Sequence, residues 1–274
     1  MSDAVLRRMA ERLTQVGGVV GVVLGGSRAR GEHVPESDVD LGLYYRPPLD
    51  VAAMGAAARE VAGPASTVTQ PGEWGPWVDG GAWLQVDGTA VDWLYRDLER
   101  VRTSWRYALQ GRSRFHAQVG HPLGVPDFAY AGELALGQVL ADPTGQLRAL
   151  QQQVAAYPLA LSEAVVTSSL WEAGFCVDIA RKAVSRGDTT YVAGCLFRTV
   201  VLCSHALHAW SGRWLVNEKG AVTAAGRLPG APERFTPRGQ GVLADLGQQP
   251  DQLRAAVVAA ADLLADVRSA CQEA

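Results

Sequence analysis

The sequence predicts an α/β (α+β) head built on a small mixed β-sheet, followed by an all-α helical bundle domain. Within the first hundred residues, short β-branched runs bounded by glycines alternate with helix-forming stretches. The pair Asp87-Gly88 separates two of these runs and is a strong hairpin signal, because both positions tolerate positive φ. Beyond Arg96 the strand-like alternation disappears and long helical periodicities replace it.

The head should begin with an amphipathic helix over residues 3–16, where apolar residues recur at helical spacing between charges. A glycine pair then leads into a short β-branched run at 19–24, which predicts a buried strand. A second strand is expected at 39–45. The alanine-rich stretch 50–61, bounded by a proline and a glycine, has the composition of a crossover helix.

Three further strands complete the expected sheet, at residues 66–70, 82–86 and 89–95. After the head, helical periodicity predicts helices near residues 97–110, 128–140, 144–156, 158–186, 189–211, 217–226, 238–247 and 251–272. The stretch 111–128 is rich in prolines and glycines and is the expected junction. It divides the chain into a catalytic domain over 1–112 and a helical substrate-binding domain over 113–274.

The composition is that of an ordinary folded globular protein, with 48% hydrophobic and 19% charged residues among 274. A formal net charge of −3 supplies no broad basic face, which argues against nucleic acid as a partner. The four cysteines are widely and irregularly spaced, as expected of reduced thiols. No signal peptide and no membrane span are expected, so we expect a cytoplasmic protein, of undetermined oligomeric state.

The turn after the first strand has the features of a phosphate cradle. The chain leaves that strand through Gly25-Gly26-Ser27, where the missing side chains let backbone N–H groups approach phosphate oxygens. A short helix should follow, and helix N-termini favour negative charge. This turn therefore predicts the site of a polyphosphate.

Two aspartates on the next strand supply the ligands of a hard cation. Asp38 and Asp40 follow Ser27 after ten residues, and alternation along a strand turns both to one face with Val39 in the core. Mg²⁺ suits such a pair, since it is typically held by one or two carboxylates and the phosphates of the substrate. Asp92, on a strand expected to neighbour this one, is the candidate third carboxylate for a two-metal site.

Several other residues admit simpler interpretations. Asp87 belongs to the hairpin, and Asp97 fits a helix N-cap. Arg28 and Arg30 could reach phosphates or remain solvated. Histidines and tryptophans at helical spacing in the second half are assigned to packing, ahead of a metal site or an acceptor cleft: His205, His208, Trp171, Trp210 and Trp214.

The combination of Gly-Ser, ten residues, Asp-x-Asp and a later strand carboxylate resembles the polymerase-β-type nucleotidyltransferase superfamily. An α/β head of this size with a helical bundle behind it is similar to the two-domain antibiotic nucleotidyltransferases, such as the kanamycin, streptomycin–spectinomycin and lincosamide enzymes. The resemblance implies that Gly26 and Ser27 contact the β and γ phosphates. It also implies that Asp38 and Asp40 ligate Mg²⁺ and that Asp92 ligates a second ion.

The same resemblance implies a nucleotide contact in the helical domain. There the segment 211–222 looks like a stretch in which a lysine reaches the triphosphate, which assigns Lys219 to nucleotide binding. Some enzymes of this class use a further carboxylate as general base. The candidates in this chain are Glu133, Glu172, Asp178 and Asp92 itself.

The expected activity is Mg²⁺-dependent transfer of a nucleoside monophosphate, AMP from ATP or the equivalent from another nucleoside triphosphate, with release of pyrophosphate. The expected acceptor is a hydroxyl of a small molecule such as an aminoglycoside or related antibiotic. The alternative is a nucleotidyltransferase-type antitoxin that modifies or binds a partner toxin protein. The long helical domain argues against this alternative, because such antitoxins are usually little more than the head.

Overall fold

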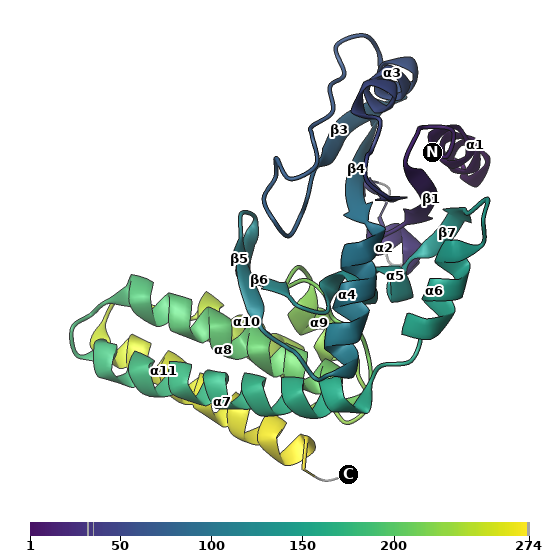
Figure 1. The fold of residues 1–274 in the computed structure, drawn as a ribbon. Coiled ribbons are helices and arrows are strands. Elements are labelled where there is room, and N and C mark those ends of the chain that lie inside the picture. The colour runs from purple at the N-terminus through teal and green to yellow at the C-terminus, as the bar shows by residue number, and fades with distance from the viewer. Residues whose placement is uncertain (32, 35, 273–274) are drawn as a thin grey trace. The chain divides into compact units, whose positions relative to one another are not determined.

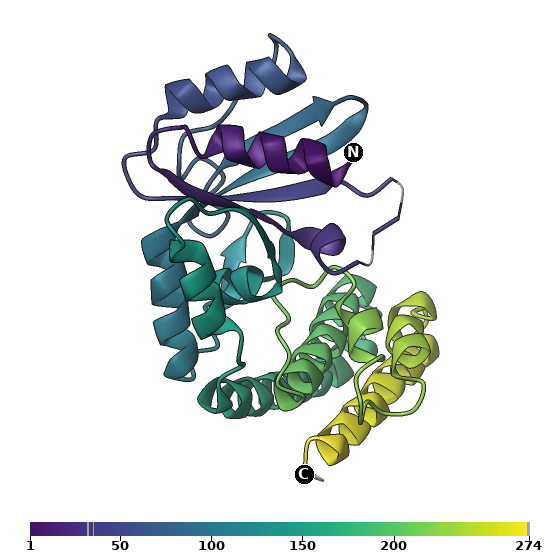
Figure 2. The same cartoon turned by 90° about the vertical axis from the view of Figure 1, so that its right-hand side faces the viewer.

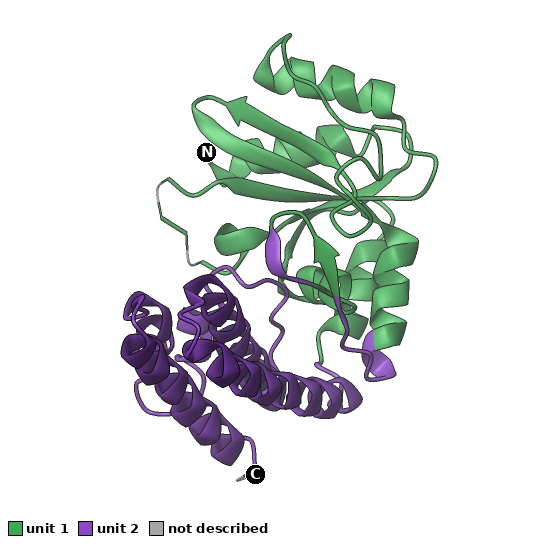
Figure 3. Ribbon diagram, turned by 90° about the vertical axis from the view of Figure 1, so that its left-hand side faces the viewer, with its two compact units in different colours: residues 1–107, 116–120, 125–156 green, residues 108–115, 121–124, 157–274 purple. Residues whose placement is uncertain are grey.

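The structure, a computed structural model, describes residues 1–31, 33–34 and 36–272. It divides the chain into two compact units, shown in Figure 3. The first unit comprises residues 1–107, 116–120 and 125–156. The second unit comprises residues 108–115 and 121–124 together with the chain from Tyr157 onward.

A five-stranded mixed sheet forms the centre of the first unit (Figure 1). The strand order is β3-β4-β2-β1-β7. The β2 and β4 strands pair in parallel, and the other neighbours pair antiparallel, which confirms the predicted mixed sheet. The strands are β1 Val19–Leu24, β2 Val39–Tyr45, β3 Gly81–Val86, β4 Thr89–Asp97 and β7 Gln138–Ala141.

Two helices cover one face of this sheet. They are α1, Asp3–Leu13, and α3, Val51–Ala62, and both lie on the same side of the strands in Figure 2. Buried side chains of both helices join Leu41, Leu43 and Trp93 of the sheet in one apolar core. The other helices of this part of the chain are α2 Gly26–Ala29, α4 Leu98–Leu109, α5 Ala129–Leu136 and α6 Gln146–Val154.

The predicted hairpin between β3 and β4 is confirmed. Asp87 and Gly88 have φ angles of 50° and 75°, the positive values that a two-residue turn of this kind requires. Val86 pairs with Thr89, so the two strands separate by two residues only. This tight turn fixes the register of every later pair along the hairpin.

The strand predicted at 66–70 is wrong, because this stretch is irregular. The Thr69 N–H donates to the Gly81 carbonyl at 2.9 Å, but the Gly81 N–H donates to the Thr69 side-chain hydroxyl at 2.8 Å. The hydroxyl takes the place that a backbone carbonyl would hold in a ladder. Thr69 and Gly81 are therefore joined by one backbone–backbone and one side-chain hydrogen bond, and a regular β-ladder does not form.

The helix predicted over 128–140 is too long, since α5 ends at Leu136. Residues Gln138–Ala141 form the edge strand β7, and pairing with β1 decides their conformation. The boundary expected at residue 112 accordingly differs from the division into compact units. The chain returns to the first unit after the hairpin region and stays there until Ala156.

The second unit is helical, as predicted, and α7, Leu159–Val184, packs against α8, Thr189–Trp210. A third long helix, α11, Pro250–Ala270, completes the bundle. The helix expected at 217–226 is reduced to α9, Ala221–Ala225, and the one expected at 238–247 begins earlier, as α10, Phe235–Ala244. Burial of Phe235 in the bundle core accounts for the early start.

A two-stranded sheet lies in the segment expected to be the junction. Its strands are β5, Phe115–Gln118, and β6, His121–Pro126. The residues of this hairpin are divided between the two units. The junction is therefore an ordered hairpin, whereas the sequence predicted irregular structure.

The α8 helix is long and apolar enough to cross a membrane by length and composition, which the sequence reading did not expect. Its most apolar window is 78% buried within the protein. This burial identifies α8 as the central helix of the second unit's core.

The two histidines of α8 are buried, in agreement with the packing role expected for them. His208 Nδ1 lies 2.8 Å from the Ser204 carbonyl oxygen, and the His205 ring contacts Phe115 edge-on at 4.9 Å between centroids. Burial, and secondarily the neighbouring His208, lowers the pKa of His205 to about 3. The neutral ring is therefore the form that the folded protein holds.

We expect acid to destabilise the protein through His205. Because its pKa is lower in the folded state than the unfolded value of about 6.5, the unfolded state binds the extra proton as the pH falls below that value. The free energy of unfolding should drop by about 2 kcal/mol from this group between pH 6.5 and pH 5. Urea titrations at these two pH values measure it.

His205→Leu should show a smaller loss than the wild type over this interval, whereas replacement of the exposed His33 by alanine should leave the loss unchanged. Equal losses in the wild type and in His205→Leu would contradict the assignment.

Candidate active site

The turn after β1 is in contact with the carboxylate of Asp40. Gly26 has a φ of 61°, and a Cβ atom built there would lie 1.8 Å from Asp40 Oδ2. The Gly25 N–H donates to the Asp40 carbonyl oxygen at 2.8 Å. Glycine is therefore required at position 26 both by the backbone angle and by the space that the carboxylate occupies.

Asp40 and Asp92 are direct neighbours across the parallel strands β2 and β4. Their flanking residues Val39, Val91 and Trp93 are fully buried in the core beneath the sheet. Side chains alternate along a strand, so the two carboxylates share the opposite face, at the inter-strand spacing of about 4.8 Å. The structure thus brings together the two aspartates that the sequence assigned to different strands.

Asp38 immediately precedes β2, whereas the sequence placed it within the strand, and it is exposed. The backbone there is held by Arg28 of α2. Its Nη2 atom donates to the Ser37 carbonyl at 2.7 Å and its Nε atom to the Asp38 carbonyl at 3.0 Å. Arg28, for which a phosphate contact or a solvated role was considered, is a positioning residue for the segment that carries Asp38.

The donor set of this face suits a hard divalent cation. Two adjacent carboxylates supply the oxygen ligands that Mg²⁺ prefers, and the side-chain-free Gly26 lies directly beside one of them. Across residues 1–31, 33–34 and 36–272, no group of three or more His, Cys, Asp or Glu side chains is arranged to hold a metal. Asp40 and Asp92 are accordingly the pair that would hold Mg²⁺, together with oxygens of a bound phosphate. Asp38 stays a predicted ligand.

Each of the other candidate bases forms an ion pair with an arginine. Glu133 binds the Arg96 guanidinium through both carboxylate oxygens, at 2.5 and 3.0 Å. Burial alone would lower the pKa of Arg96, but the Glu133 carboxylate raises it above the usual value, so the guanidinium stays charged.

The two candidates on α7 are similarly engaged. Glu172 accepts hydrogen bonds from Arg198 Nε at 2.9 Å and from its Nη2. Asp178 is exposed and pairs with Arg181, three residues further along α7, at 2.9 Å. Both carboxylates belong to the second unit.

Lys219 is exposed in a turn of the second unit, next to a well-anchored carboxylate. Glu218 accepts the Leu123 N–H at 2.9 Å and lies 3.3 Å from His121 Nδ1. Although burial would raise the pKa of Glu218, these hydrogen bonds lower it below its ordinary value. The turn that carries Lys219 is therefore fixed within its own unit, and the nucleotide contact of Lys219 stays a prediction.

A further residue of this face, Trp83, was missed by the sequence reading. Trp83 of β3 is the register partner of Asp92, and its side chain is 71% exposed. The signal was available, because a two-residue hairpin at Asp87-Gly88 pairs residue 86 with 89 and hence 83 with 92. Asp97, by contrast, accepts the Glu99 N–H at 2.8 Å, the capping role proposed for it.

Comparison with known proteins gives two matches to protein families. Residues 6–69 match the family described as a nucleotidyltransferase domain. They include Gly26, Ser27, Asp38 and Asp40, whereas Asp92 lies beyond the match. Residues 131–219 match a family described only as a domain of unknown function, DUF4037.

No curated protein matches the chain. Among solved structures, a nucleotidyltransferase-like protein from Exiguobacterium sibiricum 255-15 is similar, with a TM-score of 0.46 and 12% sequence identity. The alignment covers 96% of this chain and 74% of that one. A likeness of this degree carries no argument about activity.

Proposed function

From the nucleotidyltransferase domain matched over residues 6–69, we propose that the protein transfers a nucleoside monophosphate from ATP or another nucleoside triphosphate to a hydroxyl of a small-molecule acceptor. The observation that carries the proposal is the Asp40–Asp92 pair, which lies in register on β2 and β4 with Gly26 against Asp40. An aminoglycoside or a related antibiotic is the acceptor we favour. A supply of nucleoside triphosphate fits a cytoplasmic location.

In the proposed reaction, the acceptor oxygen attacks the α phosphorus and forms a new P–O bond. The bond from that phosphorus to the oxygen bridging toward the β phosphate breaks, and pyrophosphate leaves with the electron pair. Gly26 and Ser27 provide a backbone turn that a phosphate can approach closely. Asp40 and Asp92 would hold Mg²⁺, which neutralises phosphate charge and lowers the pKa of the attacking hydroxyl.

The hydroxyl proton must pass to a base. Asp92 lies in register with Asp40 on the face where Mg²⁺ would be held, which favours it as the carboxylate beside which the proton is lost. Arg28 would act indirectly, by holding the backbone of Ser37 and Asp38 in place.

The test is a screen of pyrophosphate release with ATP, GTP, CTP and UTP against a panel of hydroxylated acceptors that includes aminoglycosides and lincosamides. We expect release that depends on both Mg²⁺ and one class of acceptor, and an acceptor mass increased by one nucleoside monophosphate. Chelation of the metal by EDTA should abolish it. Cleavage to inorganic phosphate, or failure to bind any triphosphate in the presence of Mg²⁺, would overturn the proposal.

The identity of the acceptor can be tested in cells. Resistance conferred on a drug-sensitive host by the wild type, and not by an inactive variant, would identify an antibiotic as the acceptor. Recovery of a stoichiometric partner protein that becomes nucleotidylated would instead support the antitoxin alternative.

A further inference from the structure

The exposed face of the sheet carries one row of residues that runs across three strands. Trp83 of β3 pairs with Asp92 of β4, and Asp92 pairs with Asp40 of β2. The row continues to Gly25, whose N–H donates to the Asp40 carbonyl oxygen. The order is therefore glycine turn, first carboxylate, second carboxylate, indole.

Trp83 faces the same side of the sheet as the carboxylates. Its neighbours along β3, Ala82 and Leu84, are buried at 2% and 4% exposure in the core. Alternation then turns Trp83 to the opposite face, where its indole is exposed to solvent. Trp83 thus presents an exposed indole next to Asp92 on this face.

A second indole packs against Trp83. The rings of Trp83 and Trp74 are stacked, with centroids 4.4 Å apart and an interplanar angle of 14°. Trp74 comes from the loop before β3 and is half-buried. Trp74 thus covers one face of the Trp83 indole, and the stacked pair forms an aromatic platform whose exposed ring is Trp83, at the Asp92 end of the row.

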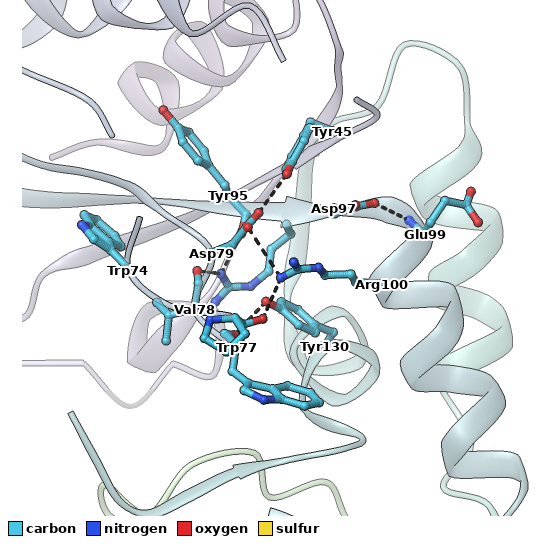
Figure 4. Close-up of polar contacts among 12 residues, drawn as sticks. Tyr45, Trp74, Trp77, Val78, Asp79, Tyr95, Asp97, Glu99, Arg100 and Tyr130 are labelled. Carbon is cyan, nitrogen blue, oxygen red and sulfur yellow. Dashed lines mark hydrogen bonds and ion pairs between the residues drawn. The ribbon is translucent and has the colours of Figure 1, made fainter. Parts of the chain in front are cut away.

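The loop that presents Trp74 is fixed by a buried aspartate. Asp79 is 2% exposed and holds an unusual positive φ of 71°. Its carboxylate accepts the Tyr45 hydroxyl at 2.9 Å, and its carbonyl oxygen accepts the N–H groups of Gly72 and Trp74 at 2.7 and 3.3 Å. Figure 4 shows this aspartate among the aromatic and arginine side chains around it.

Side chains from four other elements donate hydrogen bonds to further carbonyls of the same loop. Arg100 donates to Pro76 at 2.7 Å and Arg96 to Val78 at 3.2 Å. The Tyr130 hydroxyl donates to the Trp77 carbonyl at 2.7 Å, as Figure 4 shows, and Gln118 donates to that of Trp74 at 2.6 Å. A loop anchored at so many points keeps its conformation before any ligand arrives, which lowers the entropic cost of binding.

We propose that the stacked Trp83–Trp74 pair is the platform for the acceptor, and that it binds the apolar face of an amino-sugar ring. This inference rests on the proposed function. The row places the platform beyond Asp92, on the side away from the glycine turn assigned to the phosphates. The acceptor hydroxyl would then lie next to Asp92.

Charge favours an amino sugar over the nucleobase as the occupant. Asp92 and Asp40 lie in the same row, and the exposed Glu73 precedes Trp74 in the loop. Because Asp40 and Asp92 would hold Mg²⁺, the Glu73 carboxylate is the group that attracts an ammonium group of the acceptor. Indole faces bind both the C–H face of a ring and an adjacent cation.

The test compares Trp83→Ala and Trp83→Phe with Trp171→Ala, a matched control whose indole is similarly exposed, at 69%, on α7 of the second unit. Binding of kanamycin, streptomycin and lincomycin is measured by calorimetry with Mg²⁺ present, and binding of α,β-methylene-ATP is measured separately. For at least one amino sugar, we expect Trp83→Ala to weaken binding about tenfold and Trp83→Phe to restore most of it. The Trp83 variants should bind the ATP analogue as the wild type does. The control variant Trp171→Ala should bind both kinds of ligand as the wild type does.

Because the probes bind without turnover, these measurements do not depend on catalysis. Weakened ATP-analogue binding with unchanged amino-sugar binding would mean that the platform holds the base, and would overturn the inference. The inference would also be overturned if the protein bound no amino sugar, or if amino-sugar binding did not depend on Trp83. A dimer in sedimentation that depends on Trp83 would overturn it as well. The proposed function fails by a different result, namely no Mg²⁺-dependent pyrophosphate release from the wild type with any acceptor.

Discussion

Replacement of Asp40 by asparagine should lower the rate of pyrophosphate release by about a thousandfold or more, because it removes one of two adjacent carboxylates where positive charge must be held. Asparagine has nearly the size of aspartate, so the contact with Gly26 is preserved. The change removes a charge and little volume. Steady-state pyrophosphate assays at saturating Mg²⁺ measure the effect.

Stability gives an independent readout of the same substitution. Asp40 and Asp92 are neighbours across β2 and β4, and like charges opposite each other on a sheet destabilise it. Without metal, Asp40→Asn should therefore unfold at a temperature equal to or above that of the wild type. Addition of Mg²⁺ with a nucleoside triphosphate should raise the unfolding temperature of the wild type far more than that of the variant.

The control is Asp87→Asn, in the exposed hairpin turn, which should keep full activity. Retention of wild-type turnover by Asp40→Asn would remove the basis for the proposed site. If Asp40→Asn loses activity because it unfolds, Asp92→Asn is the second test of the site. The same loss of rate is expected for Asp92→Asn.

The second large effect is expected at Gly26, where alanine should reduce turnover by about a hundredfold. A Cβ atom at this position would lie 1.8 Å from Asp40 Oδ2, so either the carboxylate or the turn must move. Displacement of a catalytic group by about 1 Å is enough for a loss of this size. The substitution should also cost about 1–3 kcal/mol of stability through the positive φ and the clash.

Gly31→Ala is a matched control for this substitution. Gly31 has a φ of 70°, close to the 61° of Gly26, but a Cβ atom there meets no atom of the described residues within 4 Å. Both variants carry the same backbone strain, and only one carries the clash. Comparable activity in the two variants would show that Asp40 does not depend on the space at Gly26.

Most of the fold could be predicted because its signals are local. The β1, β2, β3 and β4 strands show β-branched runs, and Asp87-Gly88 marks the hairpin. The β7 strand was missed because Gln138–Ala141 has no strand signal of its own and gains its conformation from pairing with β1, far away in the sequence. Residues 66–70 were misread because the Thr69 hydroxyl ends the ladder, which no pattern of hydrophobicity reveals.

Part of the candidate site could be predicted from local signals and part could not. The spacing of Asp38 and Asp40 from Ser27 can be read directly from the sequence, and the strand pattern around Asp92 indicates which face of the sheet it lies on. The role of Arg28 depends on the path of the chain back toward β2 and could not be predicted from spacing. The anchoring of Trp74 requires side chains from as far away as Gln118 and Tyr130.

The position of β7 at the edge of the sheet bears on how this protein can be dissected. The β1 strand, which leads into the glycine turn, has β2 on one side and β7 on the other. A chain cut after residue 112 would lack β7, and the edge of β1 that pairs with β7 would be left unpaired. Unpaired apolar strand edges are a common origin of aggregation. The matched region 131–219 begins before β7 and continues past the end of α8, so sequence families and folding units divide this chain at different places. An isolated head would have to retain β7 so that β1, the strand that leads into the glycine turn, stays paired on both sides.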